Sequence, residues 1–317
     1  MSAAAAAPKV SWPGGHKFAF TVFDDTDWAT VERVKPVYDL LADLGMRTTK
    51  SVWVLRGEGA AENEGETCED ARYLDWVLRL RERGFEIGLH NVAPTTSARA
   101  QTRRGLERFG TLFGRQMIVH CNHLGCRESI YWGDARLSGW RRTTYRLLTR
   151  GRNSRNSRGH VPEDPHFWGD LCRERIGYVR NFVFDEPDTL AQCPAMPYHD
   201  DARPFVNYWF ASSNGSSLRR FLDNFTDERL DALIERGSLS VAYVHFAAGF
   251  AEGGRVNAEF RRRLEHLARA GGWFAPVSEV LDYLRDGQDT TGRTISTGDL
   301  RRLETRWLAS KVRGGTS

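Results

Sequence analysis

Apolar runs and amphipathic segments alternate along most of the chain. Short apolar, β-branched and aromatic runs predict seven strands, at residues 17–23, 48–55, 85–89, 116–121, 176–183, 204–210 and 238–246. Segments in which apolar residues recur every three or four positions predict helices at residues 29–44, 69–83, 97–113, 135–149 and 257–270. The last expected elements are a short strand at 273–275, a helix at 278–284 and a terminal helix at 298–312, packed on the outside.

Strands that alternate with helices are typical of parallel sheets with crossover connections. Seven or eight such units favour a closed or nearly closed barrel over a doubly wound sheet, and 317 residues are ordinary for one α/β barrel. We therefore expect an α/β fold, an incomplete TIM-like (β/α)7 barrel, over residues 17–288. An N-terminal tail at 1–16 and a C-terminal helix and tail at 289–317 would flank it. No GxGxxG or GxxxxGK[ST] motif indicates a nucleotide cofactor.

Polar side chains follow four of the predicted strands, where the chemistry of such barrels is located. The strand-end residues with ligating or proton-transferring side chains are Asp24, Asp25, Asp27, His90, Asn91, Asn122, His123 and His245. Adjacent carboxylates repel each other, so a cation or a proton is needed at the first strand end. One aspartate could ligate a metal while another acts as general base. An Asx turn with a helix N-cap remains an open alternative, for Asp27 in particular.

Three histidines extend this cluster. His90 ends an apolar strand, and imidazole with carboxylate is a common Zn²⁺ ligand set, although a satisfied core histidine is the alternative. His123 is the candidate third ligand, with a loop hydrogen bond or a substrate contact as alternatives. His245 ends the run VAYVHF, and the ordinary pKa of imidazole, near 6.5, suits a proton donor. A packed histidine at the strand end is its alternative.

Aromatic and basic residues near the predicted strand ends are candidates for substrate contacts. Trp53, Trp132, Trp168 and Trp209 could stack on sugar rings or simply pack, and Trp132 and Trp168 are the favoured candidates. The segment 141–160 has seven arginines and no acidic residue. It could bind an anion, but a solvated, mobile loop is the favoured interpretation.

Composition excludes several classes of protein. A net charge of +4 is too mild for the dense basic face of a nucleic-acid-binding protein. No apolar run approaches the roughly 20 residues of a transmembrane helix. Residues 1–7 lack the basic region and the long apolar region of a signal peptide, and the five cysteines form no CxxC pair. We therefore expect reduced thiols in a cytoplasmic protein.

These residues, in this order, resemble the polysaccharide deacetylases, also called the NodB-homology group or carbohydrate esterase family 4, as a divergent branch. The resemblance covers residues 18–284 in architecture and implies a (β/α)7 barrel that removes acetyl groups from sugars with a divalent metal. Residues 22–26 (VFDDT) resemble the family's motif TFDDG without its glycine. This implies Asp24 as general base and Asp25 as metal ligand. Residues 243–245 (YVH) resemble its motif LxH, which implies His245 as general acid.

Other motifs of the family match in part. The motif H[ST]xxH corresponds to residues 90–94 (HNVAP), where Pro94 stands in place of the second ligand, so His123 is expected to replace it. The motif RxPY is absent, and Arg127 is the candidate to orient the base. Residues 167–170 (FWGD) and 197–201 (PYHDD) offer further matches or contacts. We expect Asn91, Trp132, Trp168 and His199 to contact substrate.

The sequence therefore predicts a metal-dependent hydrolase, with Zn²⁺ as the favoured divalent ion. Its expected substrate is an N-acetylated sugar or glycan precursor, free or linked to a nucleotide or a lipid. Two alternatives remain open. One is a hydrolase of another amide C–N bond on the same barrel. The other is a catalytically inactive carbohydrate-binding protein, which predicts no stoichiometric metal.

Overall fold

Seven parallel strands form a closed barrel in a computed structural model, which describes residues 10–59, 61, 63–151, 157–287 and 294–314. The strands are β1 (Ala19–Asp24), β2 (Thr49–Val52), β3 (Glu86–His90), β4 (Ile118–Cys121), β5 (Ile176–Phe184), β6 (Tyr208–Gly215) and β7 (Leu239–Val244). Each strand pairs with the next in the chain, and β1 pairs with β7 to close the ring. The predicted (β/α)7 barrel is confirmed.

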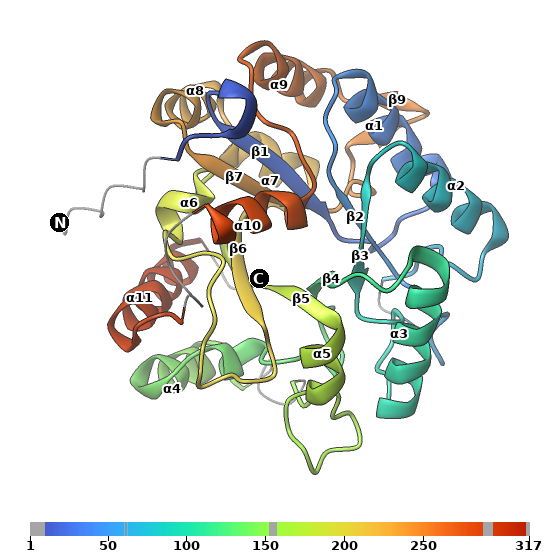
Figure 1. Cartoon of the computed structure of the whole chain (residues 1–317), viewed down its shortest axis with the longest axis vertical. Coiled ribbons are helices and arrows are strands. Elements are labelled where there is room, and N and C mark those ends of the chain that lie inside the picture. The colour runs from blue at the N-terminus through green and yellow to red at the C-terminus, as the bar shows by residue number, and fades with distance from the viewer. Residues whose placement is uncertain (1–9, 60, 62, 152–156, 288–293, 315–317) are drawn as a thin grey trace.

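Helices surround the ring of strands (Figure 1). They are α1 (Val31–Asp43), α2 (Ala71–Glu82), α3 (Arg99–Phe113), α4 (Gly139–Leu148), α5 (Gly169–Arg175), α6 (Thr189–Gln192), α7 (Leu218–Asn224), α8 (Asp227–Arg236), α9 (Ala258–Arg269), α10 (Val277–Asp286) and α11 (Thr297–Gly314). Two short 3-10 turns, η1 (Pro13–Gly15) and η2 (Gly133–Arg136), and the hairpin β8 (Ala251–Glu252) with β9 (Arg255–Val256) complete the elements. No helix of the described residues is both long and apolar enough to cross a membrane.

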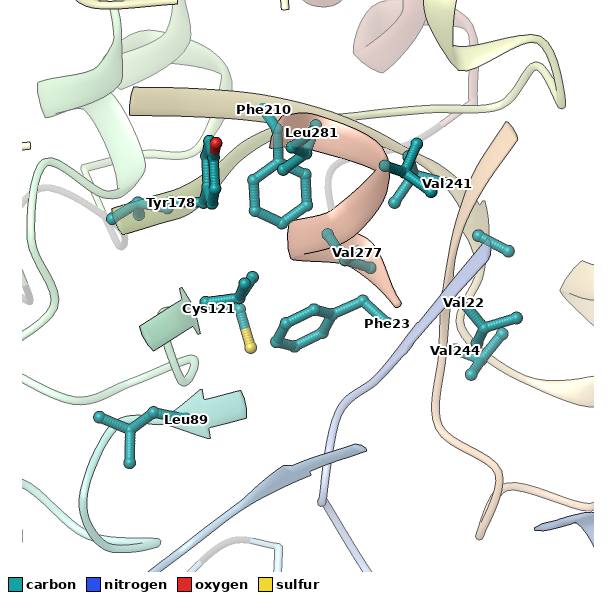
Figure 2. Close-up of a cluster of buried hydrophobic side chains, with 14 of the residues drawn as sticks. Val22, Phe23, Leu89, Cys121, Tyr178, Phe210, Val241, Val244, Val277 and Leu281 are labelled. Atoms are coloured by element: carbon teal, nitrogen blue, oxygen red, sulfur yellow. The ribbon is translucent and has the colours of Figure 1, made fainter. Parts of the chain in front are cut away.

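The barrel interior is filled by side chains from the strands. Figure 2 shows Phe23, Phe210 and Cys121 pointing into one buried cluster, with Val277 and Leu281 of α10 beside them. The ring centroids of Phe23 and Phe210 are 6.3 Å apart. Helix α10 covers the end of the barrel where the strands begin, since the Val277 N–H donates a hydrogen bond to the Thr49 hydroxyl at the start of β2. The opposite end, where the strands finish, is the one left for a site.

Two of the predicted strands were wrong in position or type. The sixth strand, expected at 204–210, runs from Tyr208 to Gly215 instead. Its last five residues are ASSNG, which are all buried although alanine is the one apolar side chain among them. The short strand expected at 273–275 is a single bridge between Ala19 and Trp273. The shift of the sixth strand arises because burial in a barrel does not require an apolar residue.

The arginine-rich segment differs from expectation, and it contacts the C-terminal helix. Helix α11 lies outside the ring of strands beside α4 (Figure 1), where Glu304 accepts hydrogen bonds from Ser138 and Arg141. Arg142 and Arg146 form ion pairs with Asp134, so residues 141–148 are helical and paired, not a solvated loop. Residues 152–156 of the same segment lie outside the described residues.

Candidate active site

A cavity of about 180 Å³ opens at the C-terminal end of the barrel. It is lined by side chains from strand ends, from the loop before α4 and from α11. The lining residues are Asp25, Asp27, Trp28, Asn63, His90, Asn122, His123, Leu124, Trp132, Arg136, Arg180, Val183, Tyr243, His245, Trp307 and Lys311. The structure therefore brings together the acidic and imidazole side chains that follow β1, β3, β4 and β7.

Asp27 stands at the centre of three imidazoles. Its Oδ2 lies 2.9 Å from Nε2 of His90 and 3.3 Å from Nε2 of His245, and its Oδ1 lies 3.4 Å from Nδ1 of His123. The facing nitrogens of His90 and His123 are 3.0 Å apart. Asp27 is not the N-cap of α1, since the Thr30 side chain caps that helix. The alternative interpretation of Asp27 as a helix cap is therefore wrong.

This arrangement fits a divalent metal ion. Oδ2 of Asp27 is buried, and no described side chain donates a well-aligned hydrogen bond to it. Four tetrahedral ligands at 2.0–2.1 Å from Zn²⁺ would be separated by about 3.3 Å, close to the distances observed between these donor atoms. Burial, then the charge of His90, lowers the pKa of His123 to about 4, which leaves the neutral imidazole that a metal requires. Asp27, His90 and His123 form the candidate metal centre.

His90 and His123 are held by groups behind the cavity. The Sγ atom of Cys121 lies 2.7 Å from Nδ1 of His90, so Nε2 faces the cavity. The ring of Trp53 stacks on His90 and meets His123 edge-on. The Asn91 side chain accepts from the His123 backbone N–H, and its Nδ2 donates to Glu128. Pro94 does not line the cavity, and His123 from the end of β4 occupies the space beside His90.

Asp25 is paired with an arginine that the sequence analysis did not single out. Nη1 and Nη2 of Arg180, in β5, donate to the two carboxylate oxygens at 2.7 and 2.6 Å. Burial acts to raise the pKa of Asp25, but the charge of Arg180 and then that of His90 outweigh it and hold that pKa below its ordinary value. The thiol of Cys121 also donates to Asp25, at 3.3 Å. Both carboxylate oxygens of Asp25 are thus already engaged.

Asp24 lies away from the cavity, although it was the expected general base. Its carboxylate is fully buried 3.0 Å from Nζ of Lys50, and it accepts hydrogen bonds from the Tyr38 hydroxyl and the Phe246 backbone N–H. Burial raises its pKa despite the charge of Lys50. Successive side chains of a strand point to opposite sides, which places Asp24 behind the barrel wall and Asp25 inside it. Asp24 is therefore paired with residues of the barrel wall and does not line the cavity.

His245 has a fixed ring orientation. Its Nδ1 lies 2.7 Å from the carbonyl oxygen of Ser216, which makes Nδ1 the protonated nitrogen and directs Nε2 toward Asp27. Burial acts to lower the pKa of His245, but the hydrogen bond and charge of Asp27 outweigh it, so the pKa lies above its ordinary value. Trp28 packs edge-on against the ring at the cavity mouth.

The remaining predicted site residues differ in whether they line the cavity. Trp132 lines the cavity, whereas Trp168 is buried behind it and donates to the backbone carbonyl of Glu128. Arg127 is exposed on the loop after β4 and makes no ion pair among the described residues. His199 lies outside the cavity, with Nδ1 close to the backbone carbonyl oxygens of Val206 and Asn207. Asn91 contacts the backbone of His123 and does not line the cavity.

Sequence reasoning missed six charged or aromatic residues that line the cavity: Trp28, Arg136, Arg180, Tyr243, Trp307 and Lys311. Arg180 is an isolated charge within the apolar run IGYVRNFVF, and a buried arginine in a strand indicates a buried acidic partner. That signal was present in the sequence. Nothing local in the sequence indicates that residues 307 and 311 return to the barrel mouth.

Together, the fold and these side chains define a β/α-barrel protein with a carboxylate–histidine centre suited to a divalent metal. The chain is similar in structure to a candidate polysaccharide deacetylase from Mycobacterium smegmatis, with 14% sequence identity and a TM-score of 0.51 over 92% of this chain and 98% of that one. Puue allantoinase (13% identity, TM-score 0.49, 90% and 95% coverage) and a candidate polysaccharide deacetylase from Pseudomonas aeruginosa PAO1 (11%, 0.49, 90% and 96%) are also similar. No protein-family model and no curated protein matches the chain. The likeness confirms the expected fold resemblance to polysaccharide deacetylases, at low identity.

Proposed function

We propose that this protein is a metal-dependent hydrolase that removes an acetyl group from the nitrogen of a sugar. The observation that carries the proposal is the convergence of the Asp27 carboxylate and the nitrogens of His90 and His123 within 3.4 Å of one another, in a cavity that also holds Asp25 and His245. A protein that only binds carbohydrate does not need five such groups around one point. The resemblance in fold to polysaccharide deacetylases supports the choice of reaction.

Asp27, His90 and His123 would hold the ion, which differs from the ligand set expected from the sequence by the exchange of Asp25 for Asp27. The chemistry that a divalent ion supplies in such a site is Lewis acidity, which acidifies water and polarises a carbonyl group. We favour Zn²⁺ because the set combines two imidazoles and one carboxylate.

Asp25 takes the role of general base in this proposal, in place of Asp24. Its carboxylate faces the cavity, and the bidentate pair with Arg180 fixes its orientation and keeps it ionised. It would accept a proton from the attacking water. His245 would act as general acid: with Nδ1–H held by Ser216, its Nε2 is the nitrogen that can deliver a proton to the leaving amine.

The cavity wall suits a ring with polar edges. Trp28, Trp132 and Trp307 present indole rings to it, and flat aromatic surfaces stack on the apolar faces of sugars. Hydrolysis of the amide in another small molecule is the second candidate, because the metal-binding and proton-transferring groups would serve any amide. An assay of acetate release from N-acetylglucosamine, with product analysis, separates the two.

Metal content tests the proposal directly. We expect about one divalent ion per purified chain, lost in D27A and H123A but retained in D25N, which would instead lose turnover. H266A is the matched control, since His266 is a histidine on α9 paired with Asp231 far from the cavity. Loss of metal in D25N with retention in D27A would restore Asp25 as the ligand. A chain that takes up no Zn²⁺ after reconstitution would overturn the enzyme proposal.

A further inference from the structure

The wall of the cavity formed by η2 and α11 carries a buried arginine. Arg136, 2% exposed, lies between two indole rings, with its guanidinium carbon 3.7 Å from the centroid of Trp132 and 4.6 Å from that of Trp307. Nε donates to the Gly133 carbonyl and Nη1 to the Asn181 carbonyl. Nη2 makes no hydrogen bond to another described residue, although Arg136 lines the cavity. Its free N–H groups are therefore available to a ligand.

No described carboxylate forms an ion pair with this arginine. The nearest acidic residue in sequence, Asp134, is occupied by Arg142 and Arg146, and Glu304 of α11 is occupied by Arg141. Burial lowers the pKa of Arg136 to about 10, which still leaves it charged at neutral pH. Burying an ion without a counter-charge is unfavourable, so a buried unpaired arginine in a cavity is expected to receive its counter-ion from a ligand.

A second cation lines the same cavity. Lys311, one turn beyond Trp307 on α11, is 4% exposed. Burial lowers its pKa to about 8, so it too is mainly charged at neutral pH. Arg180 is also present, but Asp25 neutralises it. One side of the cavity therefore carries the carboxylate–histidine centre and the other carries positive charge.

We propose that Arg136 and Lys311 form a subsite for an oxyanion of the substrate, a carboxylate or a phosphate group attached to the acetylated sugar. This inference rests on the proposed function, whose substrate class it narrows. The planar guanidinium donates to such oxyanions with favourable geometry, and the indoles on either side hold it in place. A cavity of about 180 Å³ is smaller than the roughly 300–1,000 Å³ of pockets that enclose drug-sized ligands, which fits one charged sugar unit better than a neutral polymer.

Calorimetric titration tests the subsite without turnover as the readout. The probes are N-acetylglucosamine 6-phosphate, N-acetylmuramic acid and neutral N-acetylglucosamine. We expect at least one charged sugar to bind about tenfold or more tightly than the neutral one, because a charge-assisted hydrogen bond contributes at least that factor. Preference for the first probe identifies phosphate as the anion, and preference for the second identifies carboxylate.

R136M should abolish the preference while leaving the affinity for the neutral sugar within about twofold, and K311M should reduce it. R301M is the matched control, since it removes an exposed arginine of the same helix that does not line this cavity. Should R136M not fold, the ratio of the affinities for the charged and neutral sugars, compared between the wild-type protein and K311M, decides whether the subsite exists. Equal affinity for all three sugars, or a preference that survives both variants, overturns the subsite. Preference without any acetate release would keep the subsite and overturn the deacetylase proposal instead.

Discussion

Arg180 donates hydrogen bonds to both carboxylate oxygens of Asp25, at 2.7 and 2.6 Å, across the interior of the barrel from β5 to the end of β1. Both side chains are almost completely buried. The ring of Tyr243 lies against the guanidinium, 4.1 Å from its central carbon. The pair thus couples two strands that are not neighbours in the barrel and orients a carboxylate at the candidate active site.

The first prediction concerns this pair. R180M should lower the free energy of unfolding by about 3–5 kcal/mol, because it leaves the carboxylate of Asp25 buried without a partner. It should also lower kcat about 100-fold or more, since the base loses its orientation, while metal content stays near one ion per chain. Urea unfolding, acetate release and metal analysis measure the three quantities. R302M, which removes the exposed partner of Asp299, should change stability by less than about 1 kcal/mol.

If R180M lost its metal along with its activity, Asp25 would be a ligand, and the division of roles between Asp25 and Asp27 would be wrong. R180K helps here, because it keeps the positive charge but not the bidentate geometry. It should fold more stably than R180M and still turn over slowly.

The second prediction concerns metal removal. A ligand that binds only the folded chain stabilises it, by about 2.7 kcal/mol at a free concentration one hundred times its Kd. Chelated protein should therefore melt at a lower temperature than the same protein given Zn²⁺, by several degrees. Thermal unfolding of wild type and D27A in parallel checks this. An equal rise in Tm for both would show that Zn²⁺ binds elsewhere.

The third prediction concerns Glu128, whose carboxylate accepts from Nδ2 of Asn91 and from the Ser97 backbone N–H. Burial raises its pKa to about 7, against 4.5 ordinarily. Between these two values the folded chain holds a proton that the unfolded chain has released. The contribution of protonated Glu128 to the free energy of unfolding is thus fully present below about pH 4.5. It is lost as pH rises through 7, by about 3 kcal/mol in total.

E128Q mimics the protonated acid and should remove most of this dependence. Urea unfolding at pH 5 and pH 8 should give a smaller difference for E128Q than for wild type, and a higher stability than wild type at pH 8. E163Q, at an exposed position, should follow wild type at both values. The prediction would be contradicted if the stability of wild type relative to E128Q were higher at pH 8 than at pH 5.

The fourth prediction compares two glycines of α3. A Cβ at Gly105 would lie 2.4 Å from Cβ of Val92, just after β3. A Cβ at Gly110 would lie 2.9 Å from the flexible end of Arg175 and otherwise make ordinary contacts. Alanine favours a helix interior by about 1 kcal/mol in both cases. Overpacking of about 1–3 kcal/mol should make G105A less stable than wild type, while G110A should be neutral or more stable. Thermal unfolding distinguishes them, and a G105A variant as stable as G110A would exclude close packing of α3 at this point.

Much of the barrel was predictable because parallel strands with helices on their outside are apolar and regularly spaced. The runs FAFTVF and VAYV identify β1 and β7 by composition alone. The last five residues of β6, ASSNG, were not predictable in this way, since small residues, most of them polar, are buried there in place of large apolar ones. The hydroxyl of Ser213 lies 2.7 Å from that of Thr189 in α6.

The sequence also located the strand ends that carry the site, at Asp25, His90, His123 and His245. It did not show which aspartate side chains face the cavity. Asp24 and Asp25 are chemically identical neighbours, and only the direction of each side chain separates them. One meets Lys50 behind the wall and the other meets Arg180 within it. Motif similarity indicated Asp24 as the base, whereas the structure turns the Asp24 carboxylate toward Lys50 and away from the cavity.

By itself, then, the sequence determined the fold class and the ends of the strands at which ionisable side chains gather, because both follow from local patterns of apolar and polar residues. Only the tertiary structure decided which groups meet. It brought Asp27 among three imidazoles, and it brought Trp307 and Lys311 of the last helix to a cavity built by the first strand. Contacts between residues hundreds of positions apart depend on how the closed barrel orients each side chain, and no local pattern carries that information.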